Sequence, residues 1–381
     1  MQIALVGTRG VPARYGGFET CVEEVGRRLV ERGHDVLVYC RERGPAEHLG
    51  MRRVEVPAVR QKALETLSST AVAVVDVLRR RPDVVVLFNA ANAPLLPLLR
   101  AGRVPVATHV DGLEWRRAKW SGAGRRYYRG AEALAVRWSD ALIADAAGIK
   151  QYYVDEFDAG SHEIAYGAPI LSDPGCDLLV RLGLTSGGFH LVVARFEPEN
   201  HVDLVVAGYR RSAATRPLVV VGAAPYADRH TARVRAAAAG DDRVRLIGAV
   251  WDQRLLDQLY ANAFTYLHGH SVGGTNPSLL RAMGAGTATL AYDVVFNRDV
   301  LHDAGWYFGT PEEVAALVEA AEAAPEQTAE RARRCLARAR RYDWDEVAKQ
   351  YEQLCEQLTA GRSQRGTASG RRRRRQPDRA T

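Results

Sequence analysis

One stretch of the chain, His268–Gly286, combines residue types that suit an anion or a polyhydroxyl ligand. Gly273 and Gly274 lack Cβ atoms, so the backbone there can approach a ligand closely. Asn276 is a good N-cap for the helix expected next, and Pro277 suits the first position of that helix. The helix start would present free N–H groups and a positive dipole end beside the glycines. An ordinary strand-to-helix turn has the same local pattern, so the site needs further support.

A second candidate, Arg195, ends an apolar run, HLVVARFE at 190–197, that we expect to be a strand. A guanidinium can hold two phosphate oxygens in a fork, which makes Arg195 a candidate anion ligand. The alternative is a surface arginine paired with Glu197 or Glu199.

Two further candidates, His109 and Asp111, come at the carboxyl end of the expected strand PVATHV at 105–110. Ligands of open parallel sheets bind at such strand ends. Alternatively, His109 is the last core residue of its strand and Asp111 caps a turn. No two carboxylates stand out in these loops, so a paired-carboxylate glycosidase is not supported.

Two histidines, His268 and His270, lie one residue apart at the end of an expected strand, so their side chains should point to the same side. No third ligand is evident nearby in the sequence, so we expect no metal site. His270 is instead expected to line the ligand cleft.

Apolar runs alternate with amphipathic helical stretches along most of the chain, which predicts βαβ units and parallel sheets. In the first helix, Phe18, Val22, Val25 and Leu29 form one apolar face. The alternation restarts after a turn-rich segment at 170–176. We therefore predict an α/β fold with two Rossmann-like domains facing each other across a cleft. The predicted parts are an N-terminal domain at 1–169, a second domain at 170–342, a C-terminal helix at 343–360 and a tail at 361–381.

The composition is that of a soluble globular protein with room for two domains. Of 381 residues, 47% are apolar and 25% are charged. No run reaches the roughly 18–20 apolar residues of a transmembrane helix. The start, MQIALVG, lacks a basic segment, so no signal peptide is expected. Five scattered cysteines without a CxxC spacing argue against zinc and disulfides and indicate the cytoplasm.

The net charge of +7 belongs to the C-terminal tail. Residues 361–381 contain eight arginines and one aspartate, so the rest of the chain is close to neutral. The tail is rich in Gly, Ser, Gln and Arg, which predicts disorder. We expect Arg371–Arg375 to make a peripheral contact with an anionic membrane, at its inner face. A nucleic-acid groove in the folded part is not indicated, and nucleic acid is not an expected partner.

The segments GTRG…YGGFET near the N-terminus and HGHSVGGTNPSLL at 268–280 resemble family 4 glycosyltransferases. They look most like a bacterial group of rhamnosyltransferase-like enzymes of polysaccharide synthesis, and the likeness covers nearly all of residues 1–355. The resemblance implies the GT-B fold, with the C-terminal helix packing back on the first domain. It also implies a retaining, metal-independent transfer without a cofactor, in which the nucleotide sugar is the substrate.

The resemblance also assigns roles to particular residues. It implies that Arg195 grips the donor diphosphate, although this chain has Asn200 where many members carry a lysine. Gly16 and Gly17 would lie close to the donor phosphates, unless they form an ordinary flexible loop. A histidine that touches the transferred sugar would be His109, with Asp111 as an orienting or base-like partner. The implied nucleotide-sugar site is completed by His270, Gly273, Gly274, Thr275, Asn276 and Arg281.

The sequence departs from the family at two positions. Family members carry two glutamates eight positions apart, and this chain has Gly273 and Arg281 there. A glutamate accepts O–H bonds from the ribose, whereas an arginine can only donate. Arg281 follows Pro277 by four residues, so we expect its side chain to point toward the glycine turn and a phosphate. The alternative is a solvated arginine.

We therefore expect a cytoplasmic retaining glycosyltransferase that moves a sugar from a nucleotide sugar to a glycan or a lipid-linked acceptor. Two alternatives remain open at this point. Gly273 and Arg281 would also fit a catalytically silent GT-B homologue that binds nucleotide sugar or glycan. A sugar-nucleotide epimerase of similar fold would not need an open acceptor cleft.

Overall fold

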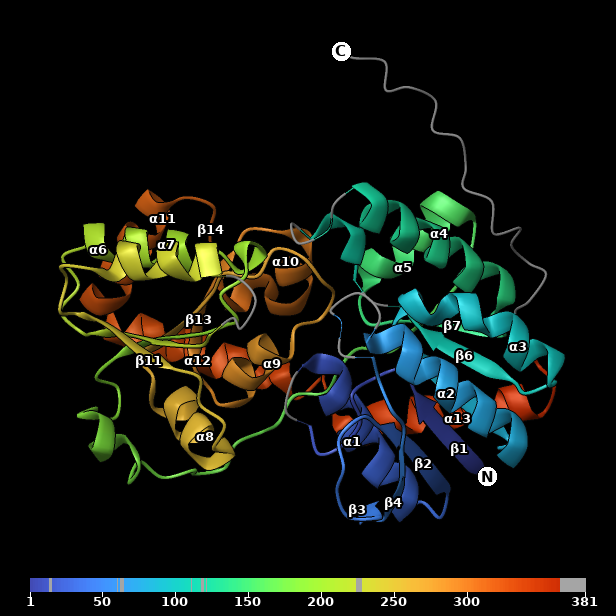
Figure 1. Cartoon of the computed structure of the whole chain (residues 1–381). Helices are drawn as coiled ribbons and strands as arrows, with labels where there is room; N and C mark the ends of the chain where they lie inside the picture. The colour runs from blue at the N-terminus through green and yellow to red at the C-terminus, as the bar shows by residue number, and fades with distance from the viewer. Residues whose placement is uncertain are drawn as a thin grey trace. The chain divides into compact units, whose positions relative to one another are not determined.

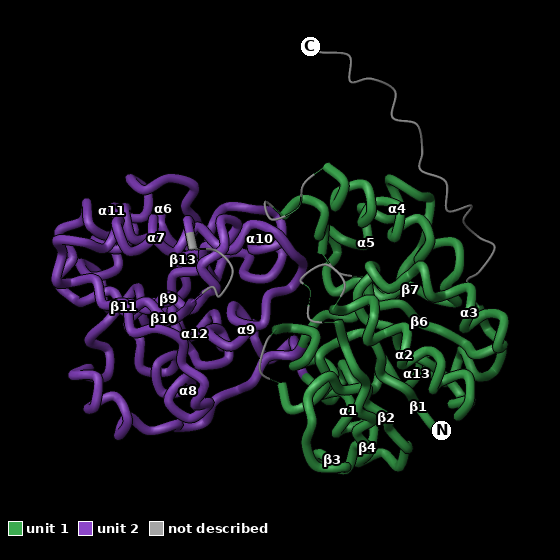
Figure 2. Tube along the Cα trace, viewed as in Figure 1, with its two compact units in different colours: residues 1–166, 344–381 green, residues 167–343 purple. Residues whose placement is uncertain are grey.

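The computed structural model describes residues 1–13, 16–59, 61, 65–110, 112–117, 120, 122–223 and 228–363. The chain divides into two compact units (Figure 2). Unit 1 comprises Met1–Tyr166 and the C-terminal residues from Trp344 onward, and unit 2 comprises Gly167–Asp343. The chain therefore crosses back into unit 1 after it has completed unit 2.

Unit 1 is built on a sheet whose strands are parallel except at one edge (Figure 1). The sheet order among the described residues is β3-β4-β2-β1-β5-β6-β7-β8, and β3 is antiparallel to β4. Parallel neighbours need crossover connections, which the helices of the unit supply. The strands are β1 (Gln2–Val6), β2 (Asp35–Cys40), β3 (Glu47–His48), β4 (Met51–Glu55), β5 (Val84–Phe88), β6 (Val106–His109), β7 (Ala141–Ala144) and β8 (His162–Glu163). The helices are α1 (Gly17–Glu31), α2 (Glu65–Arg80), α3 (Leu96–Ala101), α4 (Gly122–Trp138), α5 (Ala147–Phe157) and α13 (Trp344–Thr359), with 3₁₀ turns η1 (Ala90–Leu95) and η2 (Glu114–Arg116).

The apolar spacing predicted for the first helix and the packing predicted for the C-terminal helix are both confirmed. α1 buries Val22, Val25 and Leu29, which recur on one helical face. α13 contacts α1, so the C-terminal helix packs on the first domain as expected. Arg28 on α1 donates from Nε to Asp345 Oδ1 on α13 at 2.6 Å, which adds a polar link to the apolar contact.

Unit 2 contains a second sheet, in which every described strand pairing is parallel. Its order is β11-β10-β9-β12-β13-β14. The strands are β9 (His190–Val193), β10 (Leu218–Val221), β11 (Val244–Gly248), β12 (Thr265–His268), β13 (Ala288–Tyr292) and β14 (Trp306–Phe308). The helices are α6 (Val202–Arg211), α7 (Asp228–Ala238), α8 (Gln253–Asn262), α9 (Pro277–Gly284), α10 (Val295–Leu301), α11 (Pro311–Ala323) and α12 (Pro325–Ala339), with 3₁₀ turns η3 (Leu179–Leu182), η4 (Pro198–Asn200) and η5 (His302–Ala304).

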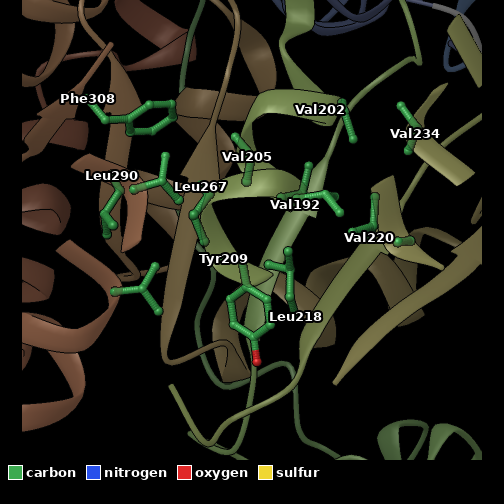
Figure 3. Close-up of a cluster of buried hydrophobic side chains, with 14 of the residues drawn as sticks. Val192, Val202, Val205, Tyr209, Leu218, Val220, Val234, Leu267, Leu290 and Phe308 are labelled. Atoms are coloured by element: carbon green, nitrogen blue, oxygen red, sulfur yellow. The ribbon is translucent and has the colours of Figure 1, made fainter. Parts of the chain in front are cut away.

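An apolar core between the sheet and α6 stabilises unit 2 (Figure 3). Val205 and Tyr209 of α6 belong to the same buried cluster as Val192 of β9 and Val220 of β10. The Tyr209 hydroxyl donates to the carbonyl of Arg216 at 2.5 Å, so this large side chain is buried without leaving its polar atom unpaired. Two parallel α/β units are therefore present, as predicted.

The structure differs from the prediction at two strands of unit 1. From its composition we would expect the apolar run at 163–168 to be a strand, but β8 ends at Glu163. The sequence also gave no sign of β4, because its MRRVE segment is rich in charge. Arg53 of β4 is nevertheless buried, since its guanidinium donates to the carbonyls of Val11, Pro45 and Glu42.

Two observations concern the chain as a whole. All five cysteines are free thiols, and four of them are buried. Within the described ranges, no helix is both long enough and apolar enough to cross a lipid bilayer.

A pair of valines tests the core of unit 2. Val205 is fully buried in the cluster, whereas Val180 on η3 is 74% exposed. We expect Val205→Ala to lower the free energy of unfolding by about 1.5–3 kcal/mol, because it loses buried methyl groups and leaves a cavity. Val180→Ala removes the same atoms at the surface and should change it by less than about 0.5 kcal/mol. Urea unfolding of the two variants measures this, and equal losses would contradict the assigned core.

Candidate functional site

The carboxyl ends of two neighbouring strands in unit 2 bring the main sequence candidates together. β9 and β12 pair directly in parallel, with Thr265 opposite His190 and Tyr266 opposite Leu191. The loops that follow them therefore begin at the same edge of the sheet, which is where parallel sheets bind ligands. We call this edge, formed by residues 194–201 and 269–276, the β9–β12 edge.

The two loops of the β9–β12 edge are joined backbone to backbone. A Cβ on Gly269 would lie 2.2 Å from the carbonyl oxygen of Asn200, so only glycine fits there. Ser271 donates from its amide and its hydroxyl to the carbonyl of Glu199, at 2.9 and 3.1 Å. His201 Nδ1 donates to the carbonyl of Gly269 at 2.8 Å. These contacts fix the position of one loop relative to the other.

Arg195 lies in this edge with an exposed side chain. Asn200 donates from Nδ2 to the Arg195 carbonyl at 2.7 Å, so the amide that replaces the family's lysine orders the loop. The alternative ion pairs with Glu197 or Glu199 do not form, and the Arg195 guanidinium has no partner among the described residues. The edge therefore offers an uncompensated cation.

The glycine turn and the start of α9 form the other half of the edge. Gly273 has φ +140°, a conformation that L side chains rarely adopt, and no atom lies within 4 Å of where its Cβ would be. Gly274 follows it, and Thr275 is buried. The Asn276 side chain accepts from the Ser278 amide at 3.0 Å, which confirms the predicted N-cap. The turn leaves open space beside a capped helix start.

His268 and His270 stack against each other, with ring centroids 4.4 Å apart, as their spacing predicts. Burial lowers the pKa of His268 to about 3, so its ring is neutral at physiological pH. The Tyr266 hydroxyl lies 3.2 Å from its Nδ1. His270 is half-buried, and Asn297 Nδ2 donates to its carbonyl at 2.9 Å. In the described part of the chain, no three His, Cys, Asp or Glu side chains form a group suited to a metal ion.

Arg281 takes a different direction from the one predicted. Its Nε and Nη2 donate to Asp257 Oδ1 at 2.9 and 2.6 Å, and its Nη1 donates to Gln253 Oε1 at 2.8 Å. The guanidinium also lies over the Tyr260 ring, 5.8 Å from its centroid. The expectation that this side chain points toward the glycine turn is wrong for this structure, because the carboxylate on α8 binds it. Its contact with a nucleotide stays a prediction.

Unit 1 carries the remaining candidates. Gly16 is the extended N-cap residue of α1 and Gly17 is its first residue, so the predicted glycines form a helix start. The preceding loop is bonded to that helix, since the Arg9 amide donates to Glu19 Oε1 at 3.0 Å and the Ala13 amide to Glu23 Oε2 at 2.8 Å. Asp111 lies outside the described residues.

His109 is buried inside a group of aromatic rings at the end of β6. It is 0% exposed and stacks with Phe88 at 5.4 Å, Tyr166 at 5.9 Å and Tyr351 at 6.5 Å between centroids. Phe18 meets it edge-on at 5.1 Å. Burial lowers the pKa of His109 to about 4. The structure thus places this ring in the core, as the sequence alternative allowed, and its catalytic role stays a prediction.

Sequence reasoning missed three residues that shape the β9–β12 edge. These residues are Ser271, His201 and Tyr292. Ser271 links the two loops, and the His201 ring stacks on the Tyr292 ring with centroids 4.1 Å apart. The backbone of His201 is left-handed, with φ +45°. No local sequence signal marks such contacts, because each depends on a partner far along the chain.

The two parallel α/β units and their strand-end loops define the class of this protein as a GT-B glycosyltransferase. A glycosyl transferase 4-like domain matches residues 16–166, and glycosyl transferases group 1 matches residues 185–342. These two matches together span well over half of the chain. The chain therefore contains a glycosyl transferase 4-like domain followed by a glycosyl transferases group 1 domain.

Several solved structures share the fold at low sequence identity. Sucrose-phosphate synthase from Thermosynechococcus elongatus is 19% identical, with a TM-score of 0.77 over 94% of this chain and 99% of that one. HepE from Anabaena in complex with UDP-glucose is 17% identical, with a TM-score of 0.74 over 94% and 100%. The catalytic domain of starch synthase IV from Arabidopsis thaliana, bound to ADP and acarbose, is 14% identical, with a TM-score of 0.72 over 94% and 99%. A comparison with curated proteins gives no match.

The contact between Arg281 and Asp257 can be measured with a double-mutant cycle. Arg281→Ala, Asp257→Ala and the double variant should give a coupling energy of about 0.5–3 kcal/mol, because the pair is partly buried and twice hydrogen-bonded. The matched control is Arg254 with Asp177, an exposed pair in the same unit, which should couple less. Additive effects of Arg281→Ala and Asp257→Ala would show that the side chain lies elsewhere.

The burial of His109 predicts a pH dependence of stability. Its pKa is about 4 in the folded chain and near its ordinary 6.5 when unfolded, so the unfolded chain binds more protons between these values. The free energy of unfolding should therefore fall as the pH drops from about 6.5 to 4. His109→Phe should keep the aromatic packing. It should also flatten this slope, because the difference in bound protons between the unfolded and the folded chain falls by up to about one. Urea unfolding across this pH range measures it, and an unchanged slope would place the ring in contact with solvent.

Proposed function

We propose that this protein is a retaining glycosyltransferase that transfers a sugar from a nucleotide sugar to a glycan or a lipid-linked acceptor in polysaccharide synthesis. The single observation that carries the proposal is the unpaired, exposed Arg195 at the β9–β12 edge, beside the glycine turn and the start of α9. The resemblance to the rhamnosyltransferase-like group suggests a hexose or deoxyhexose donor. The UDP-glucose complex of HepE and the ADP complex of starch synthase IV support a nucleoside diphosphate.

The leaving diphosphate is the group that the β9–β12 edge would stabilise. Arg195 can bind two phosphate oxygens in a fork, and the start of α9 adds backbone N–H groups and a positive dipole end. Such preorganised donors stabilise the charge that develops on the leaving group. We propose that this positive charge replaces a metal ion. The resemblance also assigns Gly16 and Gly17, at the start of α1 in unit 1, to the donor phosphates, and we expect His270, Gly273, Gly274 and Thr275 to line the sugar.

The acceptor side of the reaction is assigned to unit 1. The resemblance places a sugar contact at His109, and its burial favours Asp111, two residues further on, as the group that orients or deprotonates the acceptor. His109 would then support the strand end through its aromatic neighbours. Arg281 would contact the nucleotide only by exchanging Asp257 for a phosphate.

A catalytically silent homologue is the second candidate function. The observation that favours it is the engagement of Arg281 by α8, together with Gly273, at the two positions where the family carries glutamates. Such a protein would bind a nucleotide sugar without turning it over. The nucleotide sugar would occupy the β9–β12 edge in both cases, so a binding measurement alone does not separate the two functions.

Arg195→Ala tests the proposal. We expect kcat/KM for sugar transfer to fall by at least about tenfold, because the leaving diphosphate loses its forked contact. Arg235→Ala, an exposed arginine on α7 of the same unit, is the matched control and should leave turnover unchanged. Consumption of nucleotide sugars is measured with and without acceptor glycans, and excess EDTA should leave it unchanged.

The outcomes of this assay separate the functions. Transfer that depends on an acceptor and on Arg195 supports the glycosyltransferase. Binding without turnover supports the silent homologue, and isomerised donor would support an epimerase. Wild-type kinetics in Arg195→Ala would move the phosphate site elsewhere, and loss of activity in EDTA that Mg²⁺ restores would contradict metal independence.

A further inference from the structure

Three helices of unit 1 form a surface whose charge is not balanced. α3 contacts both α2 and α4, so the three helices are neighbours (Figure 1). Exposed arginines occur on each helix, and none of them has an ion-pair partner among the described residues. We call this surface the arginine face, and its arginines are Arg79, Arg100, Arg125, Arg126, Arg129 and Arg137.

The carboxylates of the same three helices do not neutralise the arginine face. Glu65 is bound by Arg9 at 3.1 Å and Asp76 by Arg80 at 2.6 Å. Glu132 accepts from the Tyr152 hydroxyl at 2.8 Å and interacts electrostatically with Arg129, but it is buried, and burial raises the pKa of this carboxyl to about 7. Elsewhere in the described chain, many arginines are paired with Asp or Glu, for example Arg28, Arg243 and Arg298. The positive charge here is therefore a local property of these helices.

Apolar side chains are exposed on the same helices as the arginines. Val72 and Val75 on α2, Leu98 on α3 and Tyr127 on α4 are 41–49% exposed. Isolated exposed apolar residues are common on soluble proteins, but here they accompany unpaired arginines on adjoining helices. Basic and apolar side chains together are the composition of surfaces that rest on a bilayer.

We propose that the arginine face docks on the surface of an anionic lipid bilayer. The arginines would meet the phosphate-bearing headgroups, while Val72, Val75 and Leu98 would reach the boundary with the acyl chains. Those aliphatic side chains offer nothing to a nucleic acid or an acidic glycan, which would favour free aromatic faces. Of the large rings on these helices, Trp138 already lies beneath the guanidinium groups of Arg100 and Arg137, at 5.3 and 5.5 Å, and the Tyr127 hydroxyl donates to the carbonyl of Ala91 at 2.7 Å. This inference goes beyond the proposed function, since it concerns the folded surface of unit 1 and holds whatever the catalytic activity.

The test compares two double variants of the full chain, both of which keep the C-terminal tail. Arg125→Gln/Arg126→Gln removes two charges from the arginine face, and Arg229→Gln/Arg235→Gln removes two exposed charges from α7 in unit 2. Binding to phosphatidylcholine vesicles with and without phosphatidylglycerol is measured by co-sedimentation over a range of salt. Each basic residue at an anionic surface contributes about 1 kcal/mol, so the first variant should bind the anionic vesicles roughly thirtyfold more weakly.

The expected pattern has three parts. The wild type and the unit 2 control should bind anionic vesicles equally, and binding should weaken with salt. Leu98→Ala should weaken vesicle binding less than Arg125→Gln/Arg126→Gln does, and the salt dependence of vesicle binding should stay that of the wild type. Equal binding of the two arginine variants would overturn the proposal and leave the tail as the membrane contact. Tight binding of a single-stranded oligonucleotide or heparin that the arginine variant loses, without vesicle binding by the wild type, would overturn it in favour of a soluble polyanion.

Discussion

The carbonyl group of Asn200 occupies the place where a side chain of residue 269 would otherwise be, and the β9–β12 edge depends on that contact. Because the backbones touch there, the loop after β9 and the loop after β12 are held against each other. The bonds from Ser271 to Glu199 and from His201 to Gly269 strengthen the same junction. A ligand that binds across both loops therefore meets groups whose spacing is set before it arrives, which reduces the ordering cost of binding.

The parts of the fold that follow from local patterns could be predicted from the sequence. α1 and α9 were predictable because helix periodicity and capping are local, and the central strands because buried parallel strands are apolar. β4 could not be predicted, since the burial of Arg53 depends on backbone carbonyls that only the fold brings to it. The residues at 163–168 show the opposite case, because their apolar character suggests a strand that is absent. Tyr166 is buried by stacking on His109 rather than by pairing in the sheet.

The candidate site shows the same limit at the scale of single side chains. Arg195 and Asn276 could be identified because their chemistry and their position after a strand are both visible in the sequence. The direction of Arg281 could not, since its partner Asp257 lies 24 residues earlier on another helix. The burial of His109 likewise comes from Phe88 and Tyr351, which are distant in sequence from it and from each other. Residue type and spacing therefore define the candidates, and tertiary contacts decide which of them face a ligand.

The absence of the family's two glutamates changes the electrostatics of the proposed donor site. Gly273 contributes no charge, and the charge of Arg281 is balanced by Asp257, so the edge loses two carboxylates without gaining a free cation. Near a diphosphate, the loss of negative charge favours binding, because repulsion between like charges is removed. The ribose hydroxyls lose their charged acceptors at the same time and must bond to neutral groups, which form weaker hydrogen bonds. A transferase built this way would obtain its donor affinity mainly from the diphosphate, so Arg195 and the backbone geometry fixed by Gly269 would carry the recognition that the glutamates share in the family that the sequence resembles.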